Sequence, residues 1–270
     1  MNNPATPEKI IKEIKAEIDS NTIKTSLFLI NKINTINKKY RQAKNPKIQN
    51  ILRQITREIK LVPLPQLKEQ IKNRIKTFEE SPDENTVKNI VHKIKNGSII
   101  FIYGSPKTAI ASSKEAHKRG VRFSVIIPDS GRQGQGIRTA EEISKANIKV
   151  EHIPDFLIDE AIKKADFALF EAHALIKNNK IIADIGADKL AECAKKHHTP
   201  IYAILDIFSI DMTGALKEAD FEVMENTEKQ NLVQINKTKT TINSSQITGA
   251  VTQKGILSPK KLGKIQSGLF

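Results

Sequence analysis

Three polar residues near the middle of the chain have the chemical types that proton transfer requires. Glu171 and His173 alternate along the apolar run FALFEAHAL, so in a strand both side chains would lie on one face. Asp184 ends the next apolar run and would lie across from them in a hairpin that turns at Asn178 and Asn179. A histidine with two carboxylates could relay protons or hold a divalent metal. Because such a set is more often a hydrogen-bonded polar cluster, we predict no bound metal and no cofactor.

A glycine-rich loop forms a second candidate site. The stretch VIIPDSGRQGQGIRTA, residues 125–140, passes from an apolar β-branched run through three glycines and Arg132 into the start of a helix. Glycines let backbone N–H groups approach an anion closely, above all at a helix N-terminus. The glycine spacing differs from the GxGxxG of dinucleotide-binding folds. The loop therefore predicts a site for a phosphate-bearing ligand, with an ordinary flexible surface loop as the alternative.

Two further strand ends could contribute to the same ligand site. Gly104 and Ser105 follow the run SIIFIY and precede a helix start, where backbone N–H groups could form an anion nest. Lys107, in the first turn of that helix, could bind phosphate or simply be solvated. Asp206 ends the run IYAILD and could accept a hydrogen bond from a ribose hydroxyl or cap a helix.

These residues would come together only at the edge of a sheet. The sequence from Ser98 onward has the pattern of a domain that contains such a sheet. Short β-rich runs alternate there with helical segments such as Pro106–Arg119 and Thr139–Ala146. The β-rich runs are SIIFIY, VRFSVII, IKVEHI, FALFEAHAL and IYAILDI. This alternation predicts an α/β domain over residues 98–270, with a Rossmann-like, mainly parallel sheet. After Asp211 the pattern weakens.

The N-terminal third has a different texture. Thr6 followed by Pro7 has the pattern of a helix N-cap and first turn, and isoleucines then recur at helical spacing. We therefore predict a basic helical domain over residues 1–97. Its further helices are expected within Ile23–Tyr40, Ile48–Leu61, Leu67–Phe78 and Thr86–Ile94.

The positive charge is concentrated in this helical domain. Of the formal net charge of +14, residues 1–97 carry +10 and the rest of the chain carries +4. Such a field could attract RNA, a ribosome, nucleotides or acidic proteins, although a solvated lysine-rich helix face has the same sequence pattern. The domain contains only three aromatic residues, Phe28, Tyr40 and Phe78, so little in it would stack on bases.

The cysteine content and the hydropathy of the sequence indicate the compartment in which the protein is expected. Cys193 is the single cysteine of the sequence, which excludes an intrachain disulfide and a cysteine metal cluster. The first residues lack the apolar core of a signal peptide, and no stretch approaches the ~20 apolar residues that span a bilayer. We expect a soluble cytoplasmic protein that makes no membrane contact.

Four segments in this order resemble the family that contains the alpha, beta and delta subunits of translation initiation factor two-B, ribose-bisphosphate isomerase and methylthioribose-phosphate isomerase. The segments are IIFIYGSPKTAI, DSGRQGQGIRTAEEISKANIKV, FALFEAHALIKNNKIIADIGADKLAECAKKHHTPIYAI and ITGAVTQKGILSP. The resemblance implies a Rossmann-like sheet with an N-terminal helical domain. It also implies assembly into homo- or hetero-oligomers through the sheet domain.

The resemblance also shows what this chain lacks. The family's catalytic cysteine falls at Gly104 and its catalytic aspartate at His173, and its Asn-Lys pair becomes Ala183-Asp184. Proton transfer needs a positioned acid or base, so these losses argue against the known isomerase reaction. The family's Gln-Gly and Arg-Thr pairs are retained. The expected ligand-binding residues are Gly104, Ser105, Lys107, Arg132, Gln135, Gly136, Arg138, Thr139 and Asp206.

The sequence thus favours a factor two-B-like binding or regulatory protein without isomerase activity, with a sugar-phosphate or nucleotide pocket at the sheet edge. One alternative is a sugar-phosphate isomerase rebuilt around His173, Glu171 and Asp184. A second alternative is an RNA- or ribosome-associated module that acts through the basic helices.

Overall fold

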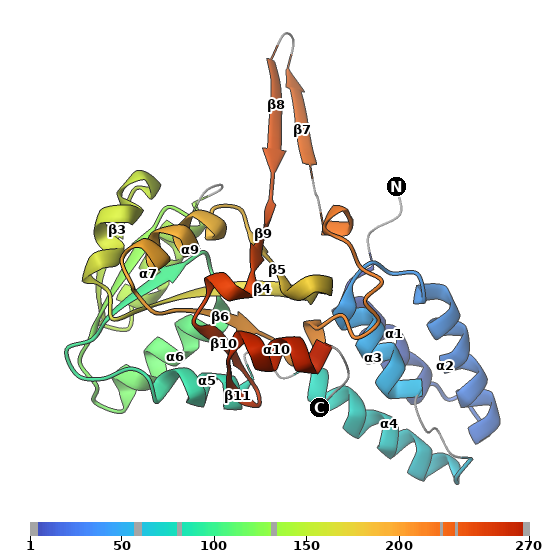
Figure 1. Ribbon diagram of the computed structural model, residues 1–270. Helices are drawn as coiled ribbons and strands as arrows, with labels where there is room; N and C mark the ends of the chain where they lie inside the picture. Colours follow the sequence, from blue (N-terminus) through green and yellow to red (C-terminus); the bar gives the residue numbers. More distant parts are fainter. Residues whose placement is uncertain are drawn as a thin grey trace. The chain divides into compact units, whose positions relative to one another are not determined.

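The computed structural model describes residues 5–56, 61–79, 83–130, 134–221, 224–229 and 232–266. The chain forms two compact units, Met1–Ser81 and Pro82–Phe270. Figure 1 shows the elements of both units, coloured along the sequence.

The first unit consists of helices, as the isoleucine spacing predicts. Its described helices are α1 (Pro7–Asp19), α2 (Ser26–Tyr40), α3 (Pro46–Thr56) and α4 (Leu64–Glu79). Helix α1 begins as expected, because the Thr6 hydroxyl accepts a hydrogen bond from the Lys9 N–H at 3.2 Å. Isoleucines from α1, α2 and α3 are buried together in the core. Tyr40 and Phe78 are also buried, which leaves Phe28, 44% exposed, as the one accessible aromatic residue of the three.

The helix α5 (Glu84–Val91) belongs to the second unit. The sequence pattern alone assigns this segment to the helical domain, with a domain boundary after residue 97. In the structure Ile90, Val91 and Ile94 are buried in the apolar cluster beneath the sheet, together with Ala109 and Ile110. The compact units therefore separate before α5 rather than after it.

The second unit contains a mainly parallel sheet, which confirms the predicted α/β fold. Its strands are β1 (Ile99–Tyr103), β2 (Ser124–Pro128), β3 (Lys149–Ile153), β4 (Phe167–Ile176), β5 (Lys180–Asp184), β6 (Ile201–Leu205), β9 (Lys239–Asn243), β10 (Gly249–Thr252) and β11 (Gly255–Leu257). The main path runs β11-β10-β6-β4-β1-β2-β3, and only β11 on that path is antiparallel to its neighbour.

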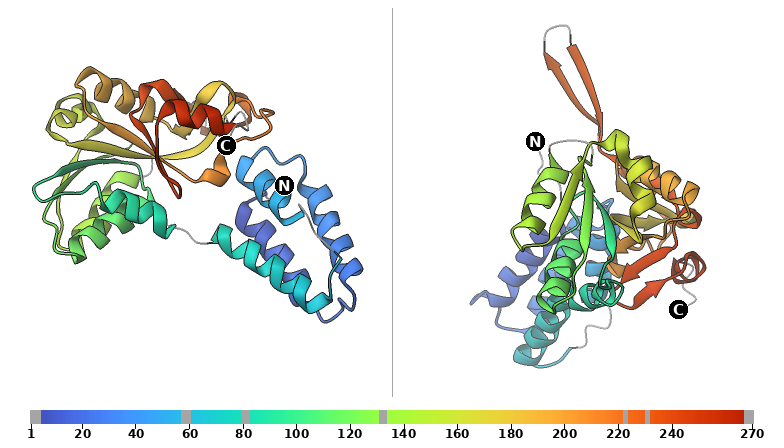
Figure 2. Two further views of the ribbon diagram at one scale, coloured as in Figure 1. Left: turned by 60° about the horizontal axis from the view of Figure 1, so that its bottom comes forward. Right: turned by 90° about the vertical axis from the view of Figure 1, so that its left-hand side faces the viewer.

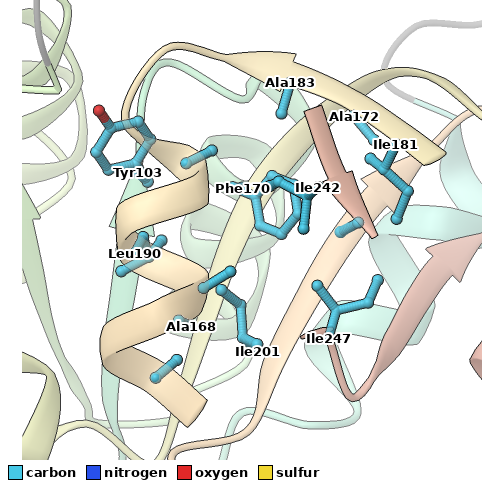
Figure 3. Packing of buried hydrophobic residues seen from close by; sticks show 14 of the residues in the cluster. Tyr103, Ala168, Phe170, Ala172, Ile181, Ala183, Leu190, Ile201, Ile242 and Ile247 are labelled. Carbon is cyan, nitrogen blue, oxygen red and sulfur yellow. The ribbon is translucent and has the colours of Figure 1, made fainter. Parts of the chain in front are cut away.

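Helices cover both faces of this sheet (Figure 2). One face packs on α5, α6 (Lys107–Lys118) and α7 (Gln135–Ser144). The other packs on α8 (Ile158–Ala161), α9 (Ala187–Lys196) and α10 (Pro259–Gln266). Figure 3 shows the second core, where Phe170, Ile181 and Ile242 come from three adjacent strands and belong to the same apolar cluster as Leu190 of α9. This packing fixes the strands that carry the candidate site.

An antiparallel arm extends the sheet beyond β4. Asn178 and Asn179 adopt left-handed φ angles of 63° and 57° and reverse the chain between β4 and β5, as the sequence predicts. The sequence did not predict β9, which pairs with the other edge of β5. Strands β7 (Met224–Lys229) and β8 (Leu232–Lys237) form a separate two-stranded sheet (Figure 1). In the described part of the chain, no helix is long and apolar enough to cross a membrane.

Candidate functional site

The turn after β1 is fixed by hydrogen bonds from two neighbouring segments. The Gly104 N–H donates to Ser130 Oγ at 2.8 Å, and the buried Thr139 hydroxyl donates to the Gly104 carbonyl at 3.0 Å. Gly104 has a φ of +81°, and a Cβ built on it would lie 3.9 Å from Asp184 Oδ2. The loop after β2, the start of α7 and the β5 carboxylate therefore meet at this turn.

Some of the predicted ligand-binding residues are buried and stabilise the turns, and others have exposed side chains. Thr139 and Gly136 are buried and hold the turns in place, whereas Ser105, Lys107 and Arg138 are exposed. Gln135 is half-buried at the start of α7, which begins four residues before our prediction because Gly134 caps it with a left-handed φ of 62°. The remaining loop residue of the prediction, Arg132, lies outside the described residues.

Asp206 acts as a cap. Its side chain accepts hydrogen bonds from the Phe208 N–H at 3.0 Å and from Gln253 Nε2 at 2.8 Å, at the start of the 3-10 helix Ile207–Ser209. The cap was the second of the two roles that the sequence left open for this residue. Its use as a ribose acceptor stays a prediction.

A charged cluster lies on the antiparallel arm. His173 Nε2 is 2.9 Å from Asp184 Oδ1, and Lys239 Nζ is 2.8 Å from the same histidine nitrogen and 2.5 Å from the same carboxylate oxygen. The three side chains are 31%, 26% and 27% exposed for His173, Asp184 and Lys239. The register of β4 and β5 shifts between Ala172 and Ala174, so His173 lies at a β-bulge, a feature that often re-aims a side chain.

Sequence reasoning placed Asp184 beside His173 but missed Lys239. The lysine is the first residue of β9 and pairs in register with Asp184. The short β-branched run KTTIN was the signal that could have revealed this strand, but it has no turn signal linking it to β5.

The cluster shifts the pKa values of two carboxyl groups in opposite directions. Burial alone would raise the pKa of Asp184, but the hydrogen bonds and charges of His173 and Lys239 outweigh it and hold that pKa at about 2. Surrounding protein raises the pKa of Glu171, although its side chain keeps an exposed surface, and the Asp184 charge adds to this rise. His173, Lys239 and Lys107 oppose the rise. Glu171 is thus the carboxyl of the site that protonates more readily.

The contacts of Asp184 with His173 and Lys239 should make the free energy of unfolding depend on pH in the acidic range. Because the pKa of this carboxyl is lower in the folded chain, its contribution is complete above pH 5 and is lost as the pH falls through about 4 to about 2. Across that range, we expect the wild type to lose on the order of 2 kcal/mol more unfolding free energy than Asp184→Asn. Urea unfolding of both proteins at several pH values measures this difference. Parallel curves for the two proteins would contradict the assignment.

Other reactive groups lie outside the cluster. Cys193, on α9, is partly buried in the core, and burial and the nearby Asp159 carboxylate raise the pKa of its thiol. Tyr103 is buried, which raises the pKa of its phenol, and the hydroxyl donates to the Ile185 carbonyl at 2.8 Å. Within the described ranges, no three histidine, cysteine or acidic side chains converge as a metal site. The cluster can accept and donate hydrogen bonds and can exchange protons.

Comparison with known proteins gives a family and a fold. The model of the "Initiation factor 2 subunit family" matches residues 3–259. The chain is 30% identical over 133 residues to translation initiation factor eIF2B subunit alpha of Dictyostelium discoideum, covering 49% of this chain and 41% of that protein. It is 25% identical over 178 residues to ribose 1,5-bisphosphate isomerase of Pyrococcus furiosus, covering 62% and 55%. The chain thus spans about half the length of these curated relatives.

Solved structures share the fold over almost the whole chain. The translation initiation factor eIF-2B of Pyrococcus horikoshii OT3 superimposes with a TM-score of 0.73 at 19% identity, covering 96% of this chain and 93% of that one. The 5-methylthioribose 1-phosphate isomerase of the same organism gives 0.69 at 17% identity, covering 97% and 82%. The tetrameric eIF2B-beta2-delta2 complex of Chaetomium thermophilum gives 0.69 at 16% identity, covering 97% and 87%.

Proposed function

The chain belongs to the Initiation factor 2 subunit family, and from this premise we propose that it is a factor two-B-like binding or regulatory protein. It binds a sugar phosphate or a nucleotide at the edge of the sheet, beside the Gly104 turn and the start of α7. Binding of this ligand changes the contacts that the chain makes with other subunits, either copies of itself or related chains.

One observation supports this proposal: hydrogen bonds fix the Gly104 turn, but residues of other types stand where the family has its reactive groups. The Gly104 turn is fixed from both sides by Ser130 and Thr139, which preserves its shape. At the position of the family's nucleophile, Gly104 supplies only backbone, and the one thiol of the chain lies on α9. His173 replaces the catalytic aspartate and is bound to Asp184 and Lys239. A rigid turn without a nucleophile favours binding over ring opening.

Ligand binding should raise the melting temperature of the full chain. We expect at least one of AMP, GMP, ribose 5-phosphate and inorganic phosphate to stabilise it, by about 2.7 kcal/mol at a concentration one hundred times its Kd. The exposed cations Lys107 and Arg138 flank the turn, so Lys107→Gln and Arg138→Gln should reduce this shift. The matched control is Lys118→Gln at the exposed end of α6, which should keep the full shift. An unchanged melt with all four compounds would overturn the proposed pocket.

A sugar-phosphate isomerase rebuilt on this cluster is the second candidate, and the raised pKa of Glu171 favours it. A carboxyl that protonates readily, next to a histidine, is a usable acid–base pair. Incubation with ribose 1,5-bisphosphate or methylthioribose 1-phosphate decides between the two functions. Formation of a ketose that is lost in His173→Ala would establish the enzyme and exclude the purely regulatory role.

A further inference from the structure

The two contacts of His173 Nε2 require opposite roles from one nitrogen. An ammonium group only donates hydrogen bonds and an ionised carboxylate only accepts them. If Nε2 carries a proton, it donates to Asp184 Oδ1 at 2.9 Å, but then it opposes the Lys239 donor at 2.8 Å. If Nε2 is unprotonated, it accepts from Lys239 and opposes the carboxylate. The cluster therefore has two alternative arrangements, and only the bond from Lys239 to Asp184 fits both.

The position of Lys239 selects between these arrangements. While the ammonium group stays against the histidine, the favoured state has an unprotonated Nε2 and a proton on Nδ1. When Lys239 moves away, Nε2 takes a proton from water and donates it in a hydrogen bond to Asp184, while Nδ1 releases its proton to water, so the charge of the ring is unchanged. The His173 side chain is 31% exposed, which allows this exchange with solvent.

A cavity adjoins the cluster on the side of Lys239. It has a volume of about 260 Å³, and Ile182 and Phe221 form an apolar part of its wall. Its charged and hydroxyl lining comes from Lys237, Lys239, Glu218 and Thr241. Glu218 is already engaged, because it accepts hydrogen bonds from Lys180 and Thr241. Lys237 is exposed, and its positive charge helps to lower the pKa of the Glu218 carboxyl.

We propose that this cavity binds a small anion between Lys237 and Lys239, and that the bound anion draws Lys239 away from His173 and switches the histidine to the arrangement with a protonated Nε2. The charge balance among the described residues supports an anion, because Lys180 pairs with Glu218 and Lys239 with Asp184, which leaves the positive charge of Lys237 in excess. The lining of the cavity is mainly polar, which suits a small anion such as a phosphate or a short carboxylate.

This inference goes beyond the sheet-edge pocket proposed above and does not depend on it. The cavity lies on the face of β5 and β9 that carries Ile182 and Thr241, next to the Asp184–Lys239 pair along the same strands. An anion there would act on the sheet-edge site through a hydrogen-bond exchange at His173.

Nitrogen-15 NMR of the histidine rings in the full chain tests the proposal, with His173→Gln used to assign the His173 signals. Inorganic phosphate and acetate serve as the phosphate and carboxylate probes. We expect saturation with at least one probe to convert His173 Nε2 from the unprotonated to the protonated form. Lys239→Met should show the protonated form without any probe, because methionine has no N–H group that could donate to Nε2. A His173 spectrum that does not change at saturation would overturn the inference.

Affinity measurements by calorimetry locate the bound anion. Lys237→Gln should weaken binding of the active probe about tenfold, as expected for the loss of one charge-assisted contact, and Lys118→Gln should leave it unchanged. If Lys107→Gln weakens binding while Lys237→Gln does not, the anion occupies the sheet-edge pocket. That result would reject the cavity and leave the proposed function intact. Loss of binding only in Lys237→Gln would support the cavity even if no sugar phosphate binds at the sheet edge.

Discussion

Replacing Gly136 with alanine should destabilise the sheet unit by about 3 kcal/mol. A Cβ at this position would lie 1.9 Å from the Pro128 carbonyl oxygen and 2.9 Å from the Asp129 carbonyl carbon. Both are backbone atoms, so no side-chain rotation relieves the collision. The start of α7 would have to move away from β2, which breaks the bond from the Gly136 N–H to the Asp129 carbonyl at 3.1 Å.

The same shift should weaken ligand binding at the sheet edge. Thr139 lies one turn further along α7 and holds the Gly104 carbonyl, so a displaced helix start loosens that turn. Urea unfolding gives the stability change, and the thermal shift with the phosphate compounds gives the binding change.

Gly120→Ala is a control for Gly136→Ala. It measures the destabilisation caused by adding a side chain where no collision occurs. Gly120 has a left-handed φ of +87° and no atom within 4 Å of a built Cβ. Gly120→Ala should therefore cost only the strain of that backbone conformation, about 1 to 2 kcal/mol. If Gly136→Ala is no more destabilising than Gly120→Ala, the turn after β2 adjusts freely and the argument for a rigid framework fails.

Removing the carboxylate of Asp211 should have an effect at least as large, about 3 to 5 kcal/mol in unfolding free energy. The residue is 1% exposed. Its Oδ1 accepts from the Thr213 N–H, the Thr213 hydroxyl and the Gly214 N–H, at 3.0, 2.6 and 3.1 Å. Its Oδ2 accepts from the Leu216 N–H at 2.9 Å. Asp211→Ala leaves three backbone donors without this acceptor, and one of them, the Leu216 N–H, is buried.

Two milder variants, Asp211→Asn and Thr213→Val, provide stability losses with which that of Asp211→Ala can be compared. Asp211→Asn keeps one oxygen that can accept the donors at Oδ1 but presents an amide where Leu216 needs an acceptor, so an intermediate loss is expected. Thr213→Val removes a single hydroxyl and should cost about 1 kcal/mol. Denaturant titrations rank the three variants. A loss below 1 kcal/mol for Asp211→Ala would mean that water replaces the carboxylate and that this turn is not a structural anchor.

Much of the fold could be predicted because its determinants are local. The Thr6 cap, the isoleucine spacing of α1 and the apolar runs of β1, β2 and β4 each specify an element within a few residues. Helix α5 shows the limit of this reasoning. Its amphipathic pattern predicts a helix, but only packing shows that its apolar face meets α6 in the sheet unit.

The candidate site also has one part that could be predicted from local sequence and one part that could not. Asp184 could be placed opposite His173 because a two-asparagine turn joins their strands directly. Lys239 could not, because its strand returns to β5 only after β6 and the β7–β8 hairpin. Without the lysine, the sequence shows a histidine with two carboxylates. With it, the structure shows a balanced cluster in which one nitrogen has two competing partners.

The late position of β9 has a consequence for the order of events during synthesis. Lys239 follows Asp184 by 55 residues, which corresponds to about 3 to 11 s at typical translation rates. During that interval the β4–β5 hairpin has an unpaired edge, and the Asp184 carboxylate lacks its lysine. The nascent chain therefore passes through a stage in which the His173 cluster lacks its lysine and an open strand edge can pair with other chains. Completion of the site and protection of that edge occur in one step, when β9 is added.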